Sequence, residues 1–323
     1  MKYDKLFETA KIGSLTLKNR FIMGAMGVGF AEMNGNPTDR TVAYYEERAK
    51  GGYALIITEV TRVQDTEFCT PLEPSLGSDK FIPGWKKVTD AVHAQGAYIF
   101  PQLHQPGRQY TKAILGHDTS APSPIACPVF DETPHELTTE EVWDNIHMFG
   151  DAAVRAKKAG FDGVEIHAGH GYLVQQFLSQ FSNRRFDEFG GSIENRARFA
   201  CEICKDIKKK CGEDYPVIIK LSGEEKVPGG MTISDTKIIA KYLEEAGYDA
   251  IEVTICNYAS LDWMSAPEDE PMGFNAYNAE KIKEGVHIPV AAIDRINTPE
   301  IAEDIIETGK ADFVSISRQS LAE

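Results

Sequence analysis

Short apolar runs alternate along this chain with longer amphipathic stretches. We expect eight strands, at residues 20–24, 54–58, 98–102, 163–167, 217–221, 250–254, 289–292 and 313–317. Helices are expected after the first seven strands, at residues 39–50, 81–94, 139–159, 193–210, 234–246, 276–284 and 299–308. A short hairpin is expected before them, over residues 10–17. The repeated alternation of strand and helix predicts an α/β fold of the (β/α)8 TIM-barrel type.

Only a few residues follow the eighth predicted strand. A complete barrel has an eighth helix at this point, which covers the outer face of that strand. We therefore expect residues 1–323 to form one barrel domain that lacks a complete eighth helix. The same observation predicts that this domain is the N-terminal part of a longer, multidomain enzyme.

The charge of the chain limits its partners. It has 49 acidic and 34 basic side chains, for a net charge of -15, which argues against nucleic acid and membrane surfaces as partners. No signal peptide or membrane-spanning run is visible, so we expect a cytoplasmic protein. Cys201 and Cys204 lie in an amphipathic stretch and are interpreted as half-buried helix residues. The sequence leaves the formation of homo-oligomers open.

Three polar side chains follow the fourth predicted strand, at the end of a barrel strand where catalytic groups gather. They are His167, His170 and Tyr172, and Gly169 and Gly171 stand between them. A neutral imidazole donates a hydrogen bond, and a phenol can deliver a proton. The pattern therefore indicates a site that polarises an oxygen atom while it protonates a carbon atom.

Two other interpretations of these histidines are open. They can be core histidines with satisfied hydrogen bonds, or, with Glu165, ligands of zinc. The zinc interpretation is disfavoured because no third ligand has a fitting spacing, and because we expect Glu165 on the other side of the strand.

The ends of the other strands carry further candidates. They are Ala25, Met26 and Gly27; Glu59 and Val60; Gln102 and His104; Lys220 and Ser222; Asn257 and Tyr258; Asp294 and Arg295; Ser317 and Arg318. Barrels commonly hold a phosphate in the last two of these loops, so both arginines are phosphate candidates as well as ordinary surface arginines. The long loop 105–138 is expected at the rim of the site.

Three runs of residues carry a resemblance to a known family. Residues 167–179 (HAGHGYLVQQFLS), 183–192 (NRRFDEFGGS) and 194–199 (ENRARF) resemble the signature of the Old Yellow Enzyme family of FMN-dependent ene-reductases. Residues 295–300 and 317–322 are similar to the subgroup with bacterial 2,4-dienoyl-CoA reductase, bile-acid-inducible steroid reductases, 2-enoate reductase and trimethylamine dehydrogenase. In that subgroup the chain continues into a segment with a 4Fe-4S cluster and an FAD/NAD(P)H domain.

The resemblance implies a set of FMN contacts. Ala25, Met26 and Gly27 match the flavin-ring contact, Val60 and Gln102 the pyrimidine edge, His167 and Lys220 the groups near the ring, and Arg295, Ser317 and Arg318 the phosphate site. Lys220 stands where arginine is more frequent in the family. Asp294 stands where glycine is common, and its carboxylate would repel a phosphate unless it is turned away.

The resemblance also implies a reaction. With NAD(P)H as reductant, a hydride passes from flavin N5 to the β-carbon of an α,β-unsaturated carbonyl or enoate substrate, such as a CoA ester or a steroid. His167 and His170 bind the substrate oxygen, and Tyr172 protonates the α-carbon. Amine-dehydrogenase-like oxidation and an FMN electron-transfer module are the alternatives. Amine-dehydrogenase relatives tend to have tyrosine in place of the first histidine, so His167 favours alkene reduction.

Overall fold

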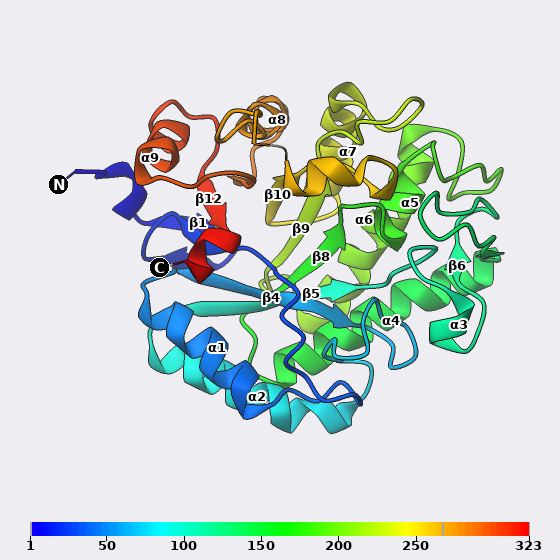
Figure 1. The fold of residues 1–323 in the computed structure, drawn as a ribbon, viewed down its shortest axis with the longest axis horizontal. Helices are drawn as coiled ribbons and strands as arrows, with labels where there is room; N and C mark the ends of the chain where they lie inside the picture. The colour runs from blue at the N-terminus through cyan, green and yellow to red at the C-terminus, as the bar shows by residue number, and fades with distance from the viewer. Residues whose placement is uncertain (1, 267, 323) are drawn as a thin grey trace.

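Eight parallel strands form a closed barrel in the computed structural model, which describes residues 2–266 and 268–322 (Figure 1). The strands are β3 (Phe21–Met23), β4 (Leu55–Arg62), β5 (Tyr98–His104), β8 (Val164–Ala168), β9 (Val217–Ser222), β10 (Ala250–Thr254), β11 (Val290–Ala292) and β12 (Phe313–Ile316). The main helices are α1 (Asp39–Lys50), α2 (Ile82–Ala94), α4 (Thr139–Lys158), α6 (Ile193–Cys211), α7 (Ile233–Glu245), α8 (Ala276–Lys283) and α9 (Pro299–Glu307). The predicted fold class is confirmed.

Local sequence signals set the ends of these helices. Thr138 starts α4 with a reciprocal cap, in which its hydroxyl accepts from the Glu141 amide and the Glu141 carboxylate accepts from the Thr138 amide. Thr38 and Thr232 cap α1 and α7 in the same way. Gly160 and Gly247 follow α4 and α7 with φ of 91° and 103°, a conformation that suits glycine and turns the chain into the next strand.

The barrel interior is built in layers, because alternate residues of a strand face the same side. Near the N-terminal ends of the strands the layer is apolar and includes Phe100, Ile218, Ala250, Ala291 and Phe313. Two residues further along β5, β8, β9 and β10 the layer is polar. The side chains of this polar layer are Gln102, Glu165, Lys220 and Glu252.

A hairpin closes the apolar end of the barrel. Its strands β1 (Ala10–Ile12) and β2 (Leu15–Leu17) pair antiparallel with Ala10 opposite Leu17, as predicted. Ile12 is 1% exposed and Leu17 is 0% exposed, and both belong to the apolar cluster inside the barrel. The open end of the barrel is therefore the C-terminal end of the strands, where the candidate residues lie.

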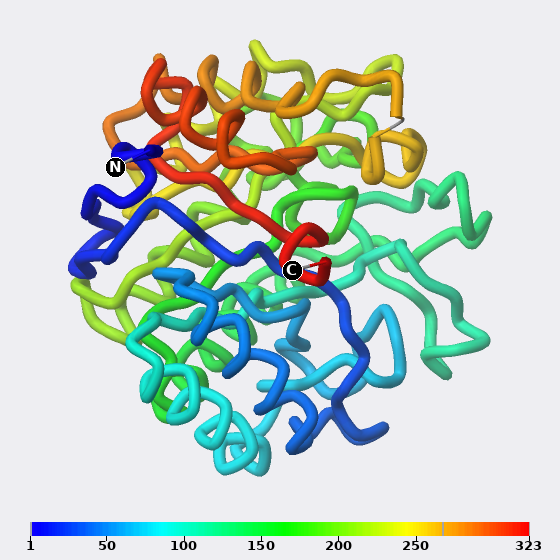
Figure 2. The backbone as a smooth tube through the Cα atoms, turned by 60° about the vertical axis from the view of Figure 1, so that its left-hand side comes forward, coloured from blue at the N-terminus to red at the C-terminus, as the bar shows by residue number. Residues whose placement is uncertain are grey.

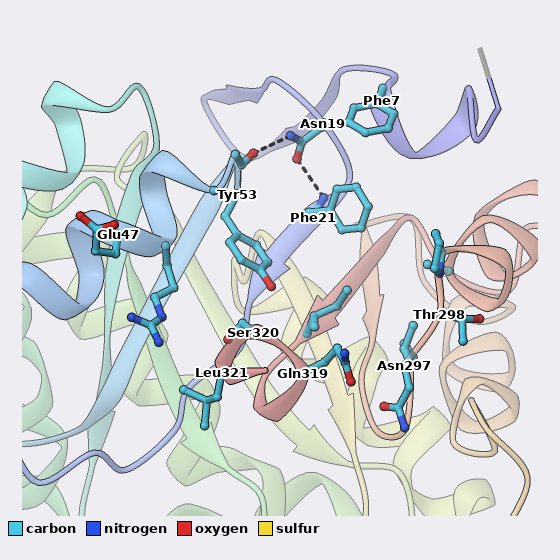
Figure 3. A pocket seen from close by; sticks show the side chains of 17 residues that line it. Phe7, Asn19, Phe21, Glu47, Tyr53, Asn297, Thr298, Gln319, Ser320 and Leu321 are labelled. Carbon is cyan, nitrogen blue, oxygen red and sulfur yellow. Dashed lines mark hydrogen bonds between the residues drawn. The ribbon is translucent and has the colours of Figure 1, made fainter. Parts of the chain in front are cut away.

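The outer face of β12 and β3 carries a groove. These last and first strands of the barrel pair directly and lie side by side (Figure 2). Among the residues that the structure describes, the short 3-10 turn η4 (Arg318–Leu321) is the only element after β12. A cavity of 710 Å³ lies there, lined among others by Phe21, Arg48 and Leu321 (Figure 3).

Loop 105–138 is fastened to the barrel. It contains α3 (Lys112–Leu115) and the two-stranded pair of β6 (Ser120–Ala121) and β7 (His135–Glu136), none of which we predicted. Arg185, from the family signature, donates to the Pro122 carbonyl at 3.0 Å and also to the Leu137 carbonyl. The loop therefore forms a fixed part of the rim. Within residues 2–266 and 268–322, no helix has the length and apolar character needed to cross a bilayer.

Candidate active site

The structure brings the predicted trio together at the C-terminal end of β8. The ring centroids of His167 and His170 are 5.2 Å apart, and those of His167 and Tyr172 are 4.9 Å apart. The turn between them needs two residues in the left-handed region, His170 at φ 56° and Gly171 at φ 78°. A Cβ on Gly171 would also lie 2.5 Å from Nε2 of Gln109. Glycine is therefore required here both for its backbone conformation and for its lack of a side chain.

Both histidines are neutral in this environment. Burial lowers the pKa of His167 well below its usual value and that of His170 to about 3. Nδ1 of His167 is an acceptor for the Gly169 amide at 3.3 Å, which leaves the proton on Nε2. Nε2 of His170 lies 3.0 Å from the Thr254 hydroxyl. His167 can therefore donate a hydrogen bond from Nε2.

Tyr172 is held by a helix that we did not predict. The short helix α5 (Leu173–Leu178) begins directly after it, and all six residues of that helix are buried. The Tyr172 hydroxyl lies 2.9 Å from the Tyr258 hydroxyl. Burial is the main reason that the pKa of Tyr172 is raised well above its usual value, so the phenol keeps its proton.

The polar layer below the trio contains an ion pair. Nζ of Lys220 lies 2.8 Å from a carboxylate oxygen of Glu252, and both side chains are nearly inaccessible. Gln102 donates to Glu165 at 2.5 Å. Burial lowers the pKa of Lys220, but attraction to Glu252 and Glu165 outweighs it, so that the pKa is raised. Burial raises the pKa of Glu165, and repulsion by Glu252 raises it further.

Our placement of Glu165 was wrong. Residues two apart in a strand face the same side, so Glu165 lies inside the barrel with His167 rather than on the opposite face. The structure places Glu165 beside Gln102 and near Lys220, and His167 pairs with Lys220 across β8 and β9. This correction does not restore the zinc interpretation, because Glu165 is engaged with Gln102 in the polar layer.

A β-bulge in β4 explains the exposure of Val60. The pairing register between β4 and β5 shifts between Ile57 and Val60, and Val60 then lies opposite Gln102. Val60 is the only residue of β4 that is not buried. Bulges often aim a residue into a neighbouring site, and this one sets Val60 and Gln102 side by side, as the resemblance requires.

Glu59 positions the loop that carries Ala25, Met26 and Gly27. One oxygen of the Glu59 carboxylate accepts from the Val28 amide at 2.9 Å and from the Gly29 amide at 3.0 Å. Burial raises the pKa of Glu59 to about 7, although these two hydrogen bonds lower it. Nothing in the sequence pointed to this role, because the contact joins β4 to a loop 30 residues earlier in the chain.

We expect Glu59→Gln to stabilise the protein above pH 7 and to have little effect at pH 5. The folded pKa of about 7 lies above the usual 4.5, so Glu59 stabilises the fold at low pH, and this stabilisation is lost as the pH rises through 7. At about 1.4 kcal/mol per pKa unit, the loss is about 3 kcal/mol. Urea unfolding of both proteins at pH 5 and pH 8 measures it. Equal differences at the two pH values would contradict the prediction.

The loops after β11 and β12 contain the predicted phosphate residues. Asp294 and Arg295 have φ of 88° and 51°, the left-handed region that glycine favours. The Asp294 carboxylate accepts from the Asn275 amide at 3.1 Å, and burial raises its pKa to about 6. It is therefore turned toward α8 and held there. Arg318 is exposed and donates to the Ser265 hydroxyl at 3.1 Å.

The residues at the barrel mouth fit a flavin with a phosphate tail. The buried hydroxyls of Ser315 and Ser317 have no hydrogen-bond partner among the described residues. A Cβ on Gly24 would lie 2.6 Å from both of them, so only glycine leaves this space. A Cβ on Gly27 would meet no atom within 4 Å, which leaves room for a flat ring. Lys220 would supply a positive charge to a flavin bound at this site.

Some residues of the site were not found from the sequence. Glu252, the partner of Lys220, lies in β10 between Ala250 and Thr254 and faces the inside of the barrel as they do. This alternation along the strand is a signal that we did not use. Tyr258 was noted at the end of β10, but its contact with Tyr172 depends on packing between loops. His104 was noted without a role.

The fold and the site together define a flavin-binding oxidoreductase of the (β/α)8 class. A model of the NADH:flavin oxidoreductase / NADH oxidase family matches residues 5–323. NADH oxidase from Thermoanaerobacter brockii is 43% identical over 325 residues, which cover 99% of this chain and 50% of that protein. Cinnamate reductase from Clostridium sporogenes is 40% identical over 344 residues, which cover 100% of this chain and 52% of that protein.

Solved structures agree with this match. A complex of 2-naphthoyl-CoA reductase with 2-naphthoyl-CoA superimposes with a TM-score of 0.95 at 31% identity, over 99% of this chain and 51% of that one. The chain belongs to the NADH:flavin oxidoreductase / NADH oxidase family, the family of old yellow enzyme. Membership implies FMN as cofactor and NAD(P)H as reductant. The chain spans about half the length of the relatives described here.

Proposed function

We propose that this domain reduces the C=C bond of an α,β-unsaturated carbonyl or enoate compound. The observation that carries the proposal is the cluster at the mouth of the barrel in which His167 contacts both His170 and the protonated phenol of Tyr172, and in which both imidazoles are neutral. When bound and reduced, FMN supplies the hydride for the β-carbon. The cinnamate and 2-naphthoyl-CoA reductases among the relatives support this class of reaction.

Each residue of the trio has its own role in the proposed reaction. Nε2–H of His167 and the His170 ring would hold the substrate oxygen, where negative charge develops as the β-carbon is reduced. Neutral imidazoles suit this role, because they donate hydrogen bonds without giving up a full proton. Tyr172 would then transfer its proton to the α-carbon, a step in which a positioned acid contributes about 10² to 10⁴ in rate.

A chain of aromatic rings supports an aromatic substrate. Phe68, Tyr110, Phe130 and Tyr258 follow one another with centroid distances of 6.0, 6.2 and 6.0 Å, and Tyr258 contacts Tyr172 at 5.6 Å. All of these rings are partly exposed. Aromatic pairs prefer such spacings and contribute about 0.5–1.5 kcal/mol each. We therefore propose that the unsaturated substrate carries a flat aromatic group that packs against these rings.

Anaerobic mixing of the reduced, FMN-loaded chain with matched aldehydes tests the proposal. Cinnamaldehyde and crotonaldehyde share the reacting group and differ in the aromatic ring. We expect both to reoxidise the flavin faster than they reoxidise free reduced FMN. Phe130→Leu should raise the cinnamaldehyde concentration that gives half the maximal rate about threefold to tenfold, which corresponds to the loss of one aromatic pair. The concentration of crotonaldehyde that gives half the maximal rate should not change.

Two outcomes would overturn the proposal. Reoxidation no faster than that of free flavin indicates an electron-transfer module, and reduction of the oxidised flavin by amines indicates an amine dehydrogenase. An equal effect of Phe130→Leu on the two aldehydes leaves the ene-reductase and removes the aromatic preference.

We also propose that the domain is the N-terminal FMN part of a longer cytoplasmic flavoenzyme. Two observations support this. The relatives described above are about twice as long as this chain. The groove on β12 and β3 would be filled by a helix of a following segment. In such an enzyme a 4Fe-4S cluster and an FAD domain would carry electrons from NAD(P)H. A native reading frame that continues past codon 323 into a cysteine-rich segment would support the proposal, and a stop codon there would overturn it.

A further inference from the structure

Three side chains beside the proposed substrate site form a cluster with the chemistry of metal ligands. Cys69 and Glu73 lie on the loop after β4, and His104 is the last residue of β5. One ligand atom of each lies within 4.8 Å of the other two. We propose that Cys69, Glu73 and His104 bind one divalent transition-metal ion, and that this ion is zinc.

The ligand types and their spacing fit zinc. Thiolate, imidazole and carboxylate are its usual ligands, whereas magnesium and calcium take oxygen ligands alone. Zinc bonds of about 2.3 Å to sulfur and about 2.0 Å to nitrogen place those two atoms about 3.6 Å apart in a tetrahedron. Sγ of Cys69 and Nε2 of His104 are 3.2 Å apart, so a small shift makes room for the ion.

The cluster contains a buried carboxylate oxygen without a partner. Glu73 is 1% exposed; its Oε2 accepts from the Cys69 amide at 2.7 Å, and its Oε1 has no hydrogen-bond partner among the described residues. Arg62 is the nearby cation, but its guanidinium donates to the Pro71 carbonyl at 2.9 Å. A bound cation would supply the partner that this carboxylate lacks.

The position of the cluster gives the ion access to solvent and to the proposed substrate. His104 is completely buried and its ring lies 4.4 Å from that of Tyr172, whereas Cys69 is partly exposed. Three protein ligands leave the fourth position of a tetrahedral ion for water or a substrate oxygen. The metal would thus lie next to the proposed proton donor.

Zinc analysis of the FMN-loaded chain tests the site. After incubation with zinc chloride and dialysis against metal-free buffer, we expect about one zinc per FMN by mass spectrometry. X-ray absorption at the zinc edge should show one sulfur neighbour at about 2.3 Å with nitrogen and oxygen neighbours at about 2.0–2.2 Å. Cys69→Ser and Glu73→Gln should each weaken zinc binding at least about tenfold, with the flavin content unchanged.

Cys201→Ser is the matched control, because Cys201 is buried in α6 and donates to the Tyr242 carbonyl, away from the cluster. This variant should bind zinc as the unchanged chain does. The proposal is overturned if the unchanged chain retains no zinc, if the bound zinc has no sulfur neighbour, or if Cys69→Ser binds it equally well. The absorption measurement uses the unchanged chain, so it decides even if a variant folds poorly.

Discussion

Tyr172→Phe is expected to slow the oxidation of the reduced flavin by an enone about 10²- to 10⁴-fold, while FMN stays bound. The change removes one hydroxyl and keeps the ring, which contacts the rings of His167 and His104 at 4.9 Å and 4.4 Å. Proton transfer to the α-carbon then has to come from water. Stopped-flow absorbance of the flavin after anaerobic mixing measures the rate.

Tyr258→Phe is the matched control, because the two phenols are 2.9 Å apart and only one of them is assigned as the acid. Its expected loss is less than about tenfold, since it removes a hydrogen bond rather than the proton donor. A full rate in Tyr172→Phe with a large loss in Tyr258→Phe would reverse the assignment. A full rate in both variants would remove both tyrosines from the chemistry.

Lys220→Met is expected to destabilise the fold by about 3–5 kcal/mol, because it leaves the Glu252 carboxylate buried without its partner. The two charged groups are 2.8 Å apart, with side-chain exposures of 3% and 1%. Glu165 lies in the same layer, so removal of the lysine leaves two carboxylates that repel each other. Urea unfolding of the flavin-free protein near pH 8 measures the change.

The double variant Lys220→Met with Glu252→Leu tests the cause. A buried ion pair replaced by apolar groups of similar size is often neutral in stability, so the second change should recover most of the loss. If the single variant loses less than about 1 kcal/mol, or if the double variant is no more stable than the single one, the ion pair does not hold this layer together. Lys220→Arg, which keeps the charge, should lose less than Lys220→Met.

The regular part of the fold was predictable because its signals are local. Thr138 with Glu141 marks the start of α4, and Gly160 marks the turn into β8. The repetition of such signals fixed the number of strands, and with it the end of the barrel at which His167, Lys220 and Ser317 meet. The hairpin at residues 10–17 was found from the same kind of evidence.

The remaining features depend on contacts between distant segments. Val60 reaches the mouth of the barrel because β4 bulges against β5, and Glu59 holds a loop 30 residues away. The pairing of Cys69 with His104 joins the loop after β4 to the end of β5 and has no local pattern. The error over Glu165 differs from these, because simple alternation along the strand already places it with His167.

The hairpin of β1 and β2 determines from which end of the barrel a ligand can reach the site. Because Ile12 and Leu17 seal one end of the cylinder with apolar side chains, no ligand can pass along its axis. Any small molecule that reacts at the trio therefore has to enter and to leave through the C-terminal end of the strands.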